Sequence, residues 1–240
     1  FGASRFAIHY PNETYGKTFM ELFRNKAEYY GADVVGIASY APDQTDFSLP
    51  IKLLANIPVS EKVSAPDRKH LTDKTEQPKK DVLVLDFNAI FIPDDASKAA
   101  LITPQLAYWD VDQVLLMGTN LWHSERLITT ARDYVQDAIL ADVFYEHSTN
   151  EAVKTFIRSF EELYGERPGF IEGLAYDAAM IAFQTASHPD VRSRTGLKDR
   201  LKEIRNYDGA TGLTSFKNNG DAQKKLYVLQ INGHNFVELN

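Results

Sequence analysis

The first part of the chain alternates between short apolar runs and longer stretches in which apolar residues recur at helical spacing. Runs rich in β-branched and aromatic residues are typical of buried strands. The alternation predicts right-handed βαβ crossovers and a doubly wound parallel sheet with helices on both faces, an α/β fold. The expected strands are Arg5–Tyr10, Val34–Tyr40, a part of Val82–Ile92, Val114–Gly118 and Ala138–Tyr145. The expected helices are Tyr15–Tyr30, Asp46–Ile57, Ala96–Trp109 and Ser124–Asp133.

The pattern changes near residue 147, where the alternation of strands and helices gives way to helices followed by hairpins. A second lobe is therefore expected to begin there. The expected helices are Asn150–Tyr164, Phe170–Ser187 and Leu197–Arg205. The expected strands are Gly209–Phe216, Lys225–Ile231 and Asn235–Leu239, with turns at 218–221 and 232–234.

Residues 58–81 interrupt the first pattern, because they combine three Pro and many charges with few large apolar residues. Such composition predicts an exposed insertion or loop. The simpler interpretation is a solvated loop that carries no function.

The composition excludes several classes of function. The 240 residues carry 26 Lys and Arg against 33 Asp and Glu, a net charge of −7, which disfavours a duplex DNA or anionic membrane surface as partner. The absence of Cys excludes thiolate catalysis, iron–sulfur clusters and Cys-type zinc sites. No apolar run reaches the 18 residues of a membrane-spanning helix. The six His show no HExxH pattern, so neither a metal nor a cofactor is expected.

The segment Pro11–Thr18 has the spacing of a Walker A phosphate loop, GxxxxGK[ST], but Pro replaces its first Gly. Phosphate cradles are built from backbone N–H groups, which Pro11 lacks, and Glu13 would bring a carboxylate to the phosphates. No nucleophile with a base is apparent either, and Asp94 and Asp95 are adjacent, so their carboxylates point apart. We therefore do not expect an enzyme, and no catalytic residue is assigned.

The loops that follow the strands are the expected binding region, because open parallel sheets bind ligands beyond the carboxyl ends of their strands. These loops carry aromatic, amide and carboxylate groups suited to a small polar ligand. The candidate ligand-binding residues are Tyr15, Asp94, Asp95, Asn120 and Trp122. In the alternative interpretation the two Asp cap the next helix and Trp122 belongs to the core.

The order of several motifs resembles the type I periplasmic solute-binding proteins. A strand leads into Tyr15-Gly16, Gly31–Val35 matches a Gly-x-x-Val-Val strand, and Tyr40 precedes Thr45-Asp46-Phe47. The later matching segments are Asp86–Pro93, Val114–Thr119, Phe160–Pro168, Ala175–Ala178, Phe216 and Asn219–Asp221. The segments LITPQLAYWD and LLMGTN resemble the leucine/isoleucine/valine-binding type and the lipoprotein activator of penicillin-binding proteins.

This resemblance implies two lobes that close over a ligand held in the cleft between them. Residues 1–146 with 223–240 would form a complete α/β lobe, and residues 147–222 a partial second lobe of helices and a hairpin. The family's amino-terminal segment of the first lobe finds no match, so either the chain is expected to be a fragment of a longer protein or that segment is a separate or removed piece. Tyr15 would contact the ligand, and Asp94 and Asp95 would line the cleft. Asn120 stands where amino-acid binders carry an acid, which leaves the ligand's ammonium without its partner unless Asp94 or Asp95 supplies the charge.

The function implied by the resemblance is capture of a small polar ligand, amino-acid-like, for ABC-type transport or sensing. The expected location is periplasmic or extracellular, with a lipid anchor possible on an upstream segment. A membrane permease would be the partner. The alternative is a protein-interaction module on the same fold, such as a lipoprotein activator that engages a peptidoglycan synthase.

Overall fold

The structure is a computed structural model that describes residues 2–58 and 83–239. The chain divides into two compact units. Unit 1 consists of Phe1–Ile139 with Ile231–Asn235, and unit 2 of Leu140–Gln230 with Phe236–Asn240. The lobe boundaries expected from the sequence, after residue 146 and around 223, stay a prediction. The expected insertion at 58–81 lies, except for Pro58, outside the described residues.

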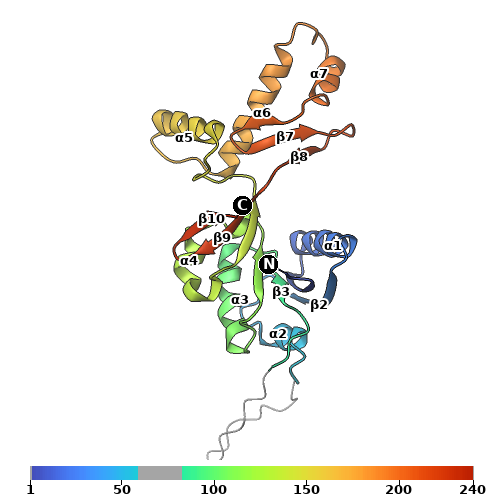
Figure 1. Ribbon diagram of the computed structural model, residues 1–240, viewed down its shortest axis with the longest axis vertical. Coiled ribbons are helices and arrows are strands. Elements are labelled where there is room, and N and C mark those ends of the chain that lie inside the picture. The colour runs from blue at the N-terminus through green and yellow to red at the C-terminus, as the bar shows by residue number, and fades with distance from the viewer. Residues whose placement is uncertain (1, 59–82, 240) are drawn as a thin grey trace, which may run out of the picture. The chain divides into compact units, whose positions relative to one another are not determined.

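Unit 1 contains strands and helices in the alternating order that the sequence predicts (Figure 1). Most observed elements agree with the expected ranges within a few residues. The strands are β1 (Arg5–Pro11), β2 (Asp33–Tyr40), β3 (Ala89–Phe91), β4 (Leu115–Gly118) and β5 (Ile139–Asp142), the last of which continues into unit 2. The helices are α1 (Thr14–Tyr29), α2 (Ser48–Leu54), α3 (Ala96–Tyr108) and α4 (Glu125–Ala131), with short 3₁₀ turns η1 (Asn120–Trp122) and η2 (Arg132–Val135).

Together with β9 (Tyr227–Asn232) and β10 (Asn235–Glu238), these strands form a seven-stranded sheet in the order β10-β9-β5-β4-β3-β1-β2. The pairs β1/β2, β1/β3 and β3/β4 are parallel, which confirms the α/β fold with a mostly parallel sheet. The chain moves from β1 to β2 in one direction and onward to β3 and β4 in the other. Right-handed crossovers therefore put α1 on one face and α2, α3 and α4 on the opposite face. In agreement, α2 contacts α3 and α3 contacts α4.

The core of unit 1 lies on both faces of this sheet. On the face of α1, the ring of Phe23 stacks on Phe91 with centroids 4.4 Å apart. The sheet residues Ile8 and Ile90 and the α3 residue Ile102 are fully buried. Burial on both faces explains why the strands are almost entirely apolar in sequence.

Unit 2 contains three helices and a small antiparallel sheet. The helices are α5 (Glu151–Tyr164), α6 (Phe170–Ala186) and α7 (Arg194–Leu201). The small sheet has the order β6-β7-β8, with β6 at Tyr207–Gly209, β7 at Gly212–Phe216 and β8 at Ala222–Lys224. The strands β9 (Tyr227–Asn232) and β10 (Asn235–Glu238) complete the chain. The core of unit 2 is a buried cluster of Phe144, Val153, Phe156 and Ala210.

Two expected elements of this unit are wrong in detail. The single strand expected at Gly209–Phe216 is divided: Gly209 ends β6, residues 210–211 form a tight turn, and Gly212–Phe216 is β7, with Gly212 at a φ of +76°. The helix expected at Leu197–Arg205 spans Arg194–Leu201, because the Ser193 hydroxyl accepts a hydrogen bond from the Gly196 N–H and starts it earlier. None of the helices in the described ranges is long and apolar enough to span a membrane.

Candidate ligand-binding site

The candidate site lies at the carboxyl ends of β1, β3 and β4, within unit 1. The parallel register sets Ile8 beside Phe91, and Phe91 beside Met117. The loops that follow these three strands therefore leave the sheet at the same edge. These loops and the first turns that follow them carry the five residues predicted from the sequence. Two of them, Tyr15 and Asp94, each take part in a hydrogen-bonded pair there.

Tyr15 connects the first of these loops to the loop after β4. Its hydroxyl donates a 2.9 Å hydrogen bond to the Thr119 Oγ1. Thr119 is buried, and its side chain also accepts from the Leu121 N–H at the start of η1. Burial raises the pKa of Tyr15, the bond to Thr119 lowers it, and the nearby charge of Asp94 raises it. The phenol therefore stays protonated at neutral pH and lies within the electrostatic reach of Asp94.

Asp94 is a half-buried carboxylate with two internal donors. Its Oδ2 accepts a 2.8 Å hydrogen bond from the Tyr40 hydroxyl, and its Oδ1 accepts from the Asp95 N–H at 2.7 Å. Burial raises the pKa of Asp94, and these two hydrogen bonds lower it. Tyr40 is 3% exposed, and burial together with the charge of Asp94 raises the pKa of its phenol, so it remains a donor.

The carboxylate of Asp95 caps a helix and takes no part in the two hydrogen-bonded pairs of the site. Its carboxylate accepts hydrogen bonds from the N–H groups of Ser97 at 2.7 Å and Lys98 at 2.9 Å and so caps α3. This is the helix-capping alternative considered from the sequence, now observed for one of the two Asp. A direct role of Asp95 in ligand binding stays a prediction.

Trp122 is fully buried. Its ring packs against Gly118 so closely that a Cβ on that glycine would lie 2.2 Å from a ring atom. This position agrees with the core alternative considered from the sequence. The expected role of Trp122 as an apolar wall for a ligand stays a prediction. The half-buried Asn120 precedes it in η1, next to Thr119, and in the described ranges its side-chain amide makes no hydrogen bond.

The loop that resembles a phosphate-binding motif has a packing role. A Cβ on the buried Gly16 would lie 2.2 Å from the Pro11 carbonyl oxygen, so glycine is needed for α1 to start against β1. The Thr18 hydroxyl donates to the Thr14 carbonyl at 2.8 Å. Within the part of the chain that the structure describes, no three His, Asp or Glu side chains gather where they could hold a metal ion.

Two further residues, Tyr40 and Thr119, belong to the site but were not predicted. Tyr40 ends β2, and its neighbourhood is aromatic, with the ring centroid of His9 at 4.5 Å. Thr119 directly follows β4. Position at the end of a predicted strand is the one signal in the sequence that could have indicated both.

Comparison with known proteins gives one family and a set of similar folds. The sequence profile of a family described as periplasmic binding protein matches residues 1–235. A putative branched-chain amino acid ABC transporter from Rhodospirillum rubrum superposes with a TM-score of 0.81 at 21% identity, over 99% of this chain and 61% of that chain. A leucine-binding protein from Thermotoga maritima gives 0.72 at 20% identity, over 100% of this chain and 60% of that chain.

A third similar structure is the branched-chain amino acid substrate-binding protein LivJ from Streptococcus pneumoniae in complex with isoleucine. It gives a TM-score of 0.65 at 20% identity, over 99% of this chain and 61% of that chain. The chain thus spans about 60% of the length of the solved structures that it matches. Comparison with curated protein sequences gave no match. At these identities the similar structures establish the fold.

Proposed function

The chain belongs to the periplasmic binding protein family, and from this premise we propose that it captures a small polar solute, amino-acid-like, at the carboxyl edge of the unit 1 sheet. The observation that carries the proposal is two hydrogen-bonded pairs at that edge, Tyr15 with Thr119 and Tyr40 with Asp94. Polar groups held by buried partners are preorganised, which lowers the cost of binding.

Each group has a distinct role in this proposal. Asp94, with its carboxylate half-exposed, pairs with a cationic or hydrogen-bond-donating group of the ligand. Tyr15 stacks on the ligand or hydrogen-bonds to it, and the amide of Asn120 supplies a donor and an acceptor. Asp94 thereby takes the part of the acid that the neutral Asn120 cannot play.

The physiological setting is part of the same proposal. Two of the similar proteins are described as a leucine-binding protein and as a binding protein in complex with isoleucine. We infer a periplasmic or extracellular location and delivery of the solute to an ABC-type membrane permease, or sensing of the solute. Lipid anchoring stays a prediction.

A thermal-shift screen of amino acids, amides and short carboxylates on the full-length protein tests this function, because a ligand that binds the folded state raises its melting temperature. We expect one chemical class to stabilise the protein in a concentration-dependent manner, and Asp94→Asn to weaken that stabilisation. The variant Tyr29→Phe, at an exposed tyrosine, serves as a control and should leave the stabilisation by the ligand unchanged. The proposal is wrong if no solute stabilises the protein or if Asp94→Asn has no effect.

The alternative of a protein-interaction module that engages a peptidoglycan synthase stays a prediction. This alternative rests on the neutral Asn120 and on the charged segment 58–81, and that segment lies almost entirely outside the described residues. Pull-down of peptidoglycan synthases with the protein, with and without residues 58–81, distinguishes the two functions.

A further inference from the structure

Helix α6 of unit 2 presents an apolar face to solvent in the part of the chain that the structure describes. The exposed residues of this face recur at spacings of four, four, three and four positions: Ile171, Ala175, Ala179, Ala182 and Ala186. Residues at these spacings lie along one side of a helix. We call this face the α6 stripe.

Two aromatic side chains widen the α6 stripe along one flank. Phe183 is 68% exposed and Tyr176 is 41% exposed. Between Glu172 and His188 the one charged residue is Asp177, which is buried. The exposed surface of α6 is therefore free of charge over about four helical turns.

The buried face of α6 is more polar than the exposed one. Its buried residues are Gly173, Asp177, Ile181 and Thr185. The Asp177 carboxylate accepts hydrogen bonds there from the N–H groups of Ala210 and Thr211. A surface helix ordinarily buries its apolar side and exposes its polar side. The reversed arrangement in α6 is typical of a helix that packs against another molecule.

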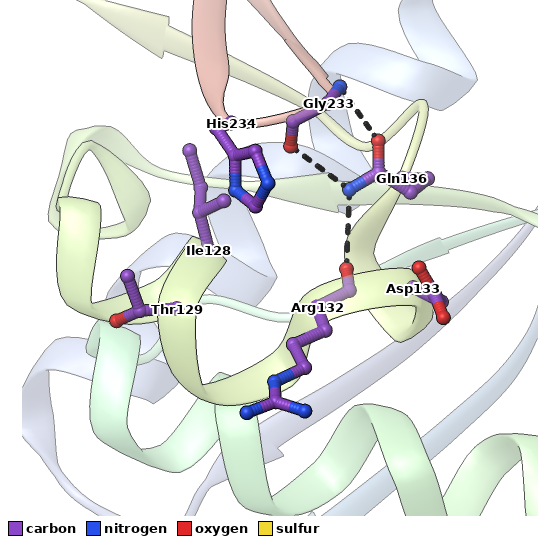
Figure 2. A pocket seen from close by; sticks show the side chains of 7 residues that line it. All are labelled: Ile128, Thr129, Arg132, Asp133, Gln136, Gly233 and His234. Atoms are coloured by element: carbon purple, nitrogen blue, oxygen red, sulfur yellow. Dashed lines mark hydrogen bonds between the residues drawn. The ribbon is translucent and has the colours of Figure 1, made fainter.

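A hollow of unit 1 shows how a solvated surface of this protein is built. It has a volume of about 630 Å³ and lies between α4 and the turn that joins β9 to β10 (Figure 2). The Nε2 of Gln136 donates hydrogen bonds across it to the carbonyl oxygens of Arg132 at 3.2 Å and Gly233 at 3.1 Å. The exposed charged residues Arg132 and Asp133 also line it. The α6 stripe has no such charges.

Opposite charges lie at the two ends of the α6 stripe. Near its beginning, residues 161–172 carry four Glu against the single cation Arg167, a net charge of −3. Near its end, residues 188–205 carry six Lys and Arg against three Asp and Glu, a net charge of +3. Helix α7, which holds several of these cations, contacts α6. The stripe is therefore complementary in charge to a copy of itself that runs in the opposite direction.

We propose that the α6 stripe is an interface with a second copy of this chain, packed antiparallel about a two-fold axis. A pair centred on Ala178 and Ala179 places Ile171 of one copy opposite Ala186 of the other. Large residues thus meet small ones, and the central alanines let the two helices approach closely. The two-fold axis repeats each contact, so both acidic ends meet basic ends.

Sedimentation-velocity ultracentrifugation of the 240-residue chain over a range of concentrations tests the proposal. We expect a reversible equilibrium between monomer and dimer. Ala179→Glu should raise the Kd of the dimer by about tenfold or more, because two like charges would be buried at its centre. Glutamate is a good helix former, so circular dichroism should show an unchanged fold. The control is Thr155→Glu, at an exposed position of α5 outside the stripe, which should leave the Kd unchanged.

Oxidative cross-linking tests the antiparallel arrangement. Because the chain contains no Cys, a single introduced thiol reports on one position. Ala179→Cys lies near the proposed two-fold axis and should form a disulfide-linked dimer, whereas Ala186→Cys should not, because its two copies would lie far apart.

The proposal is overturned if the chain is monomeric up to about 100 μM, which would indicate that a different polypeptide covers the stripe. It is equally overturned if Ala179→Glu dimerises as tightly as the wild type. An Ala179→Cys variant that cross-links no better than Ala186→Cys would also contradict it, because that result excludes an antiparallel pair centred on Ala178 and Ala179.

Discussion

The Tyr40 hydroxyl donates a 2.8 Å hydrogen bond to the Oδ2 of Asp94 and so ties the end of β2 to the loop after β3. The two residues are 54 positions apart in the chain. The bond holds the carboxylate of Asp94 in one orientation and opposes the increase in its pKa that burial causes. The first two predictions concern this pair.

Replacing Tyr40 by Phe removes the donor and keeps the buried ring. The pKa of Asp94 should rise further, because the Tyr40 hydrogen bond lowers it. The free energy of unfolding should fall by about 1 kcal/mol, the usual net value of a hydrogen bond. NMR titration of the Asp94 carboxyl and urea denaturation measure the two effects. Tyr108→Phe, at a tyrosine that is 75% exposed, should change neither.

Replacing Asp94 by Asn should weaken ligand binding without destabilising the fold at neutral pH. The folded pKa of Asp94 is raised above its ordinary value of 3.8. The stability contributed by such an acid is complete below the unfolded pKa and is lost as pH rises through the folded pKa. Ionised Asp94 therefore lowers the free energy of unfolding at pH 7, and its partial exposure keeps this effect small. In urea denaturation, the free energy of unfolding of the variant should equal that of the wild type or exceed it by up to about 1 kcal/mol. A clear loss of stability at pH 7 would contradict this assignment.

His9 should make the protein sensitive to mild acid. Burial lowers the pKa of His9 to about 4, while its ordinary value is 6.5. Between these two values the unfolded chain binds the proton and the folded protein does not, so stability should fall as pH decreases from 6.5 to 4. The expected loss is about 2 kcal/mol between pH 7 and pH 5, measured by urea denaturation at both.

His9→Phe should abolish this part of the pH dependence, because it keeps an aromatic ring and removes the titrating group. His234→Gln, at an exposed histidine, is the control that should retain it. An unchanged pH profile of His9→Phe would show that other groups cause the acid sensitivity.

Gly118→Ala should destabilise unit 1 by about 1–3 kcal/mol, the usual cost of overpacking a core. The added Cβ would lie 2.2 Å from the ring of Trp122, so the ring and η1 must move. Thr119 and Asn120 lie in the same segment, and ligand affinity should fall together with the melting temperature. Gly196→Ala, where the nearest atom would be 3.5 Å away, is the control and should be neutral or stabilising.

Asp177 anchors the turn between β6 and β7 to α6 in unit 2. This carboxylate is 2% exposed and accepts hydrogen bonds from the N–H groups of Ala210 at 2.7 Å and Thr211 at 2.8 Å, and from the Thr211 hydroxyl. Lys224 lies 3.8 Å away, with a side chain that is 15% exposed. Asp177→Ala should cost about 3–5 kcal/mol, because it leaves buried N–H donors without their acceptor and the largely buried Lys224 without its counter-charge.

Asp177→Asn keeps one acceptor and should cost clearly less than Asp177→Ala. Chemical denaturation of both variants, followed by circular dichroism, measures the difference. Equal losses in the two variants would indicate that the volume of the side chain, and not its hydrogen bonds, carries the effect.

The sequence predicted the sheet and the helices of unit 1 well, because the relevant signals are local. Strands buried on both faces are almost wholly apolar, and helices show their period directly. The full burial of His9 agrees with its position inside an apolar strand. Asp95 as a helix cap also follows from its position immediately before α3.

The sequence could not predict the hydrogen-bonded pairs of the candidate site, because each bond joins residues that are far apart in the chain. Tyr15 and Thr119 are separated by 104 positions, and no periodicity carries such a pairing. The turn that divides the strand expected at Gly209–Phe216 was missed for the same reason. Its apolar and β-branched residues favour a continuous strand, whereas Asp177 of α6, 33 positions before Ala210, binds the backbone at the turn.

Strand β2 ends the seven-stranded sheet in the part of the chain that the structure describes, and its Val35 and Ile37 are 37% and 41% exposed. An open strand edge with apolar side chains is a template for pairing with another molecule. Near the start of this edge, Asp33 and Asp86 lie 3.6 and 3.8 Å from the guanidinium of Arg5. Two carboxylates around one cation leave this end of the edge negative, which opposes stacking of identical copies. Self-association of the protein in concentrated solution should therefore depend on ionic strength more than on the stability of the fold.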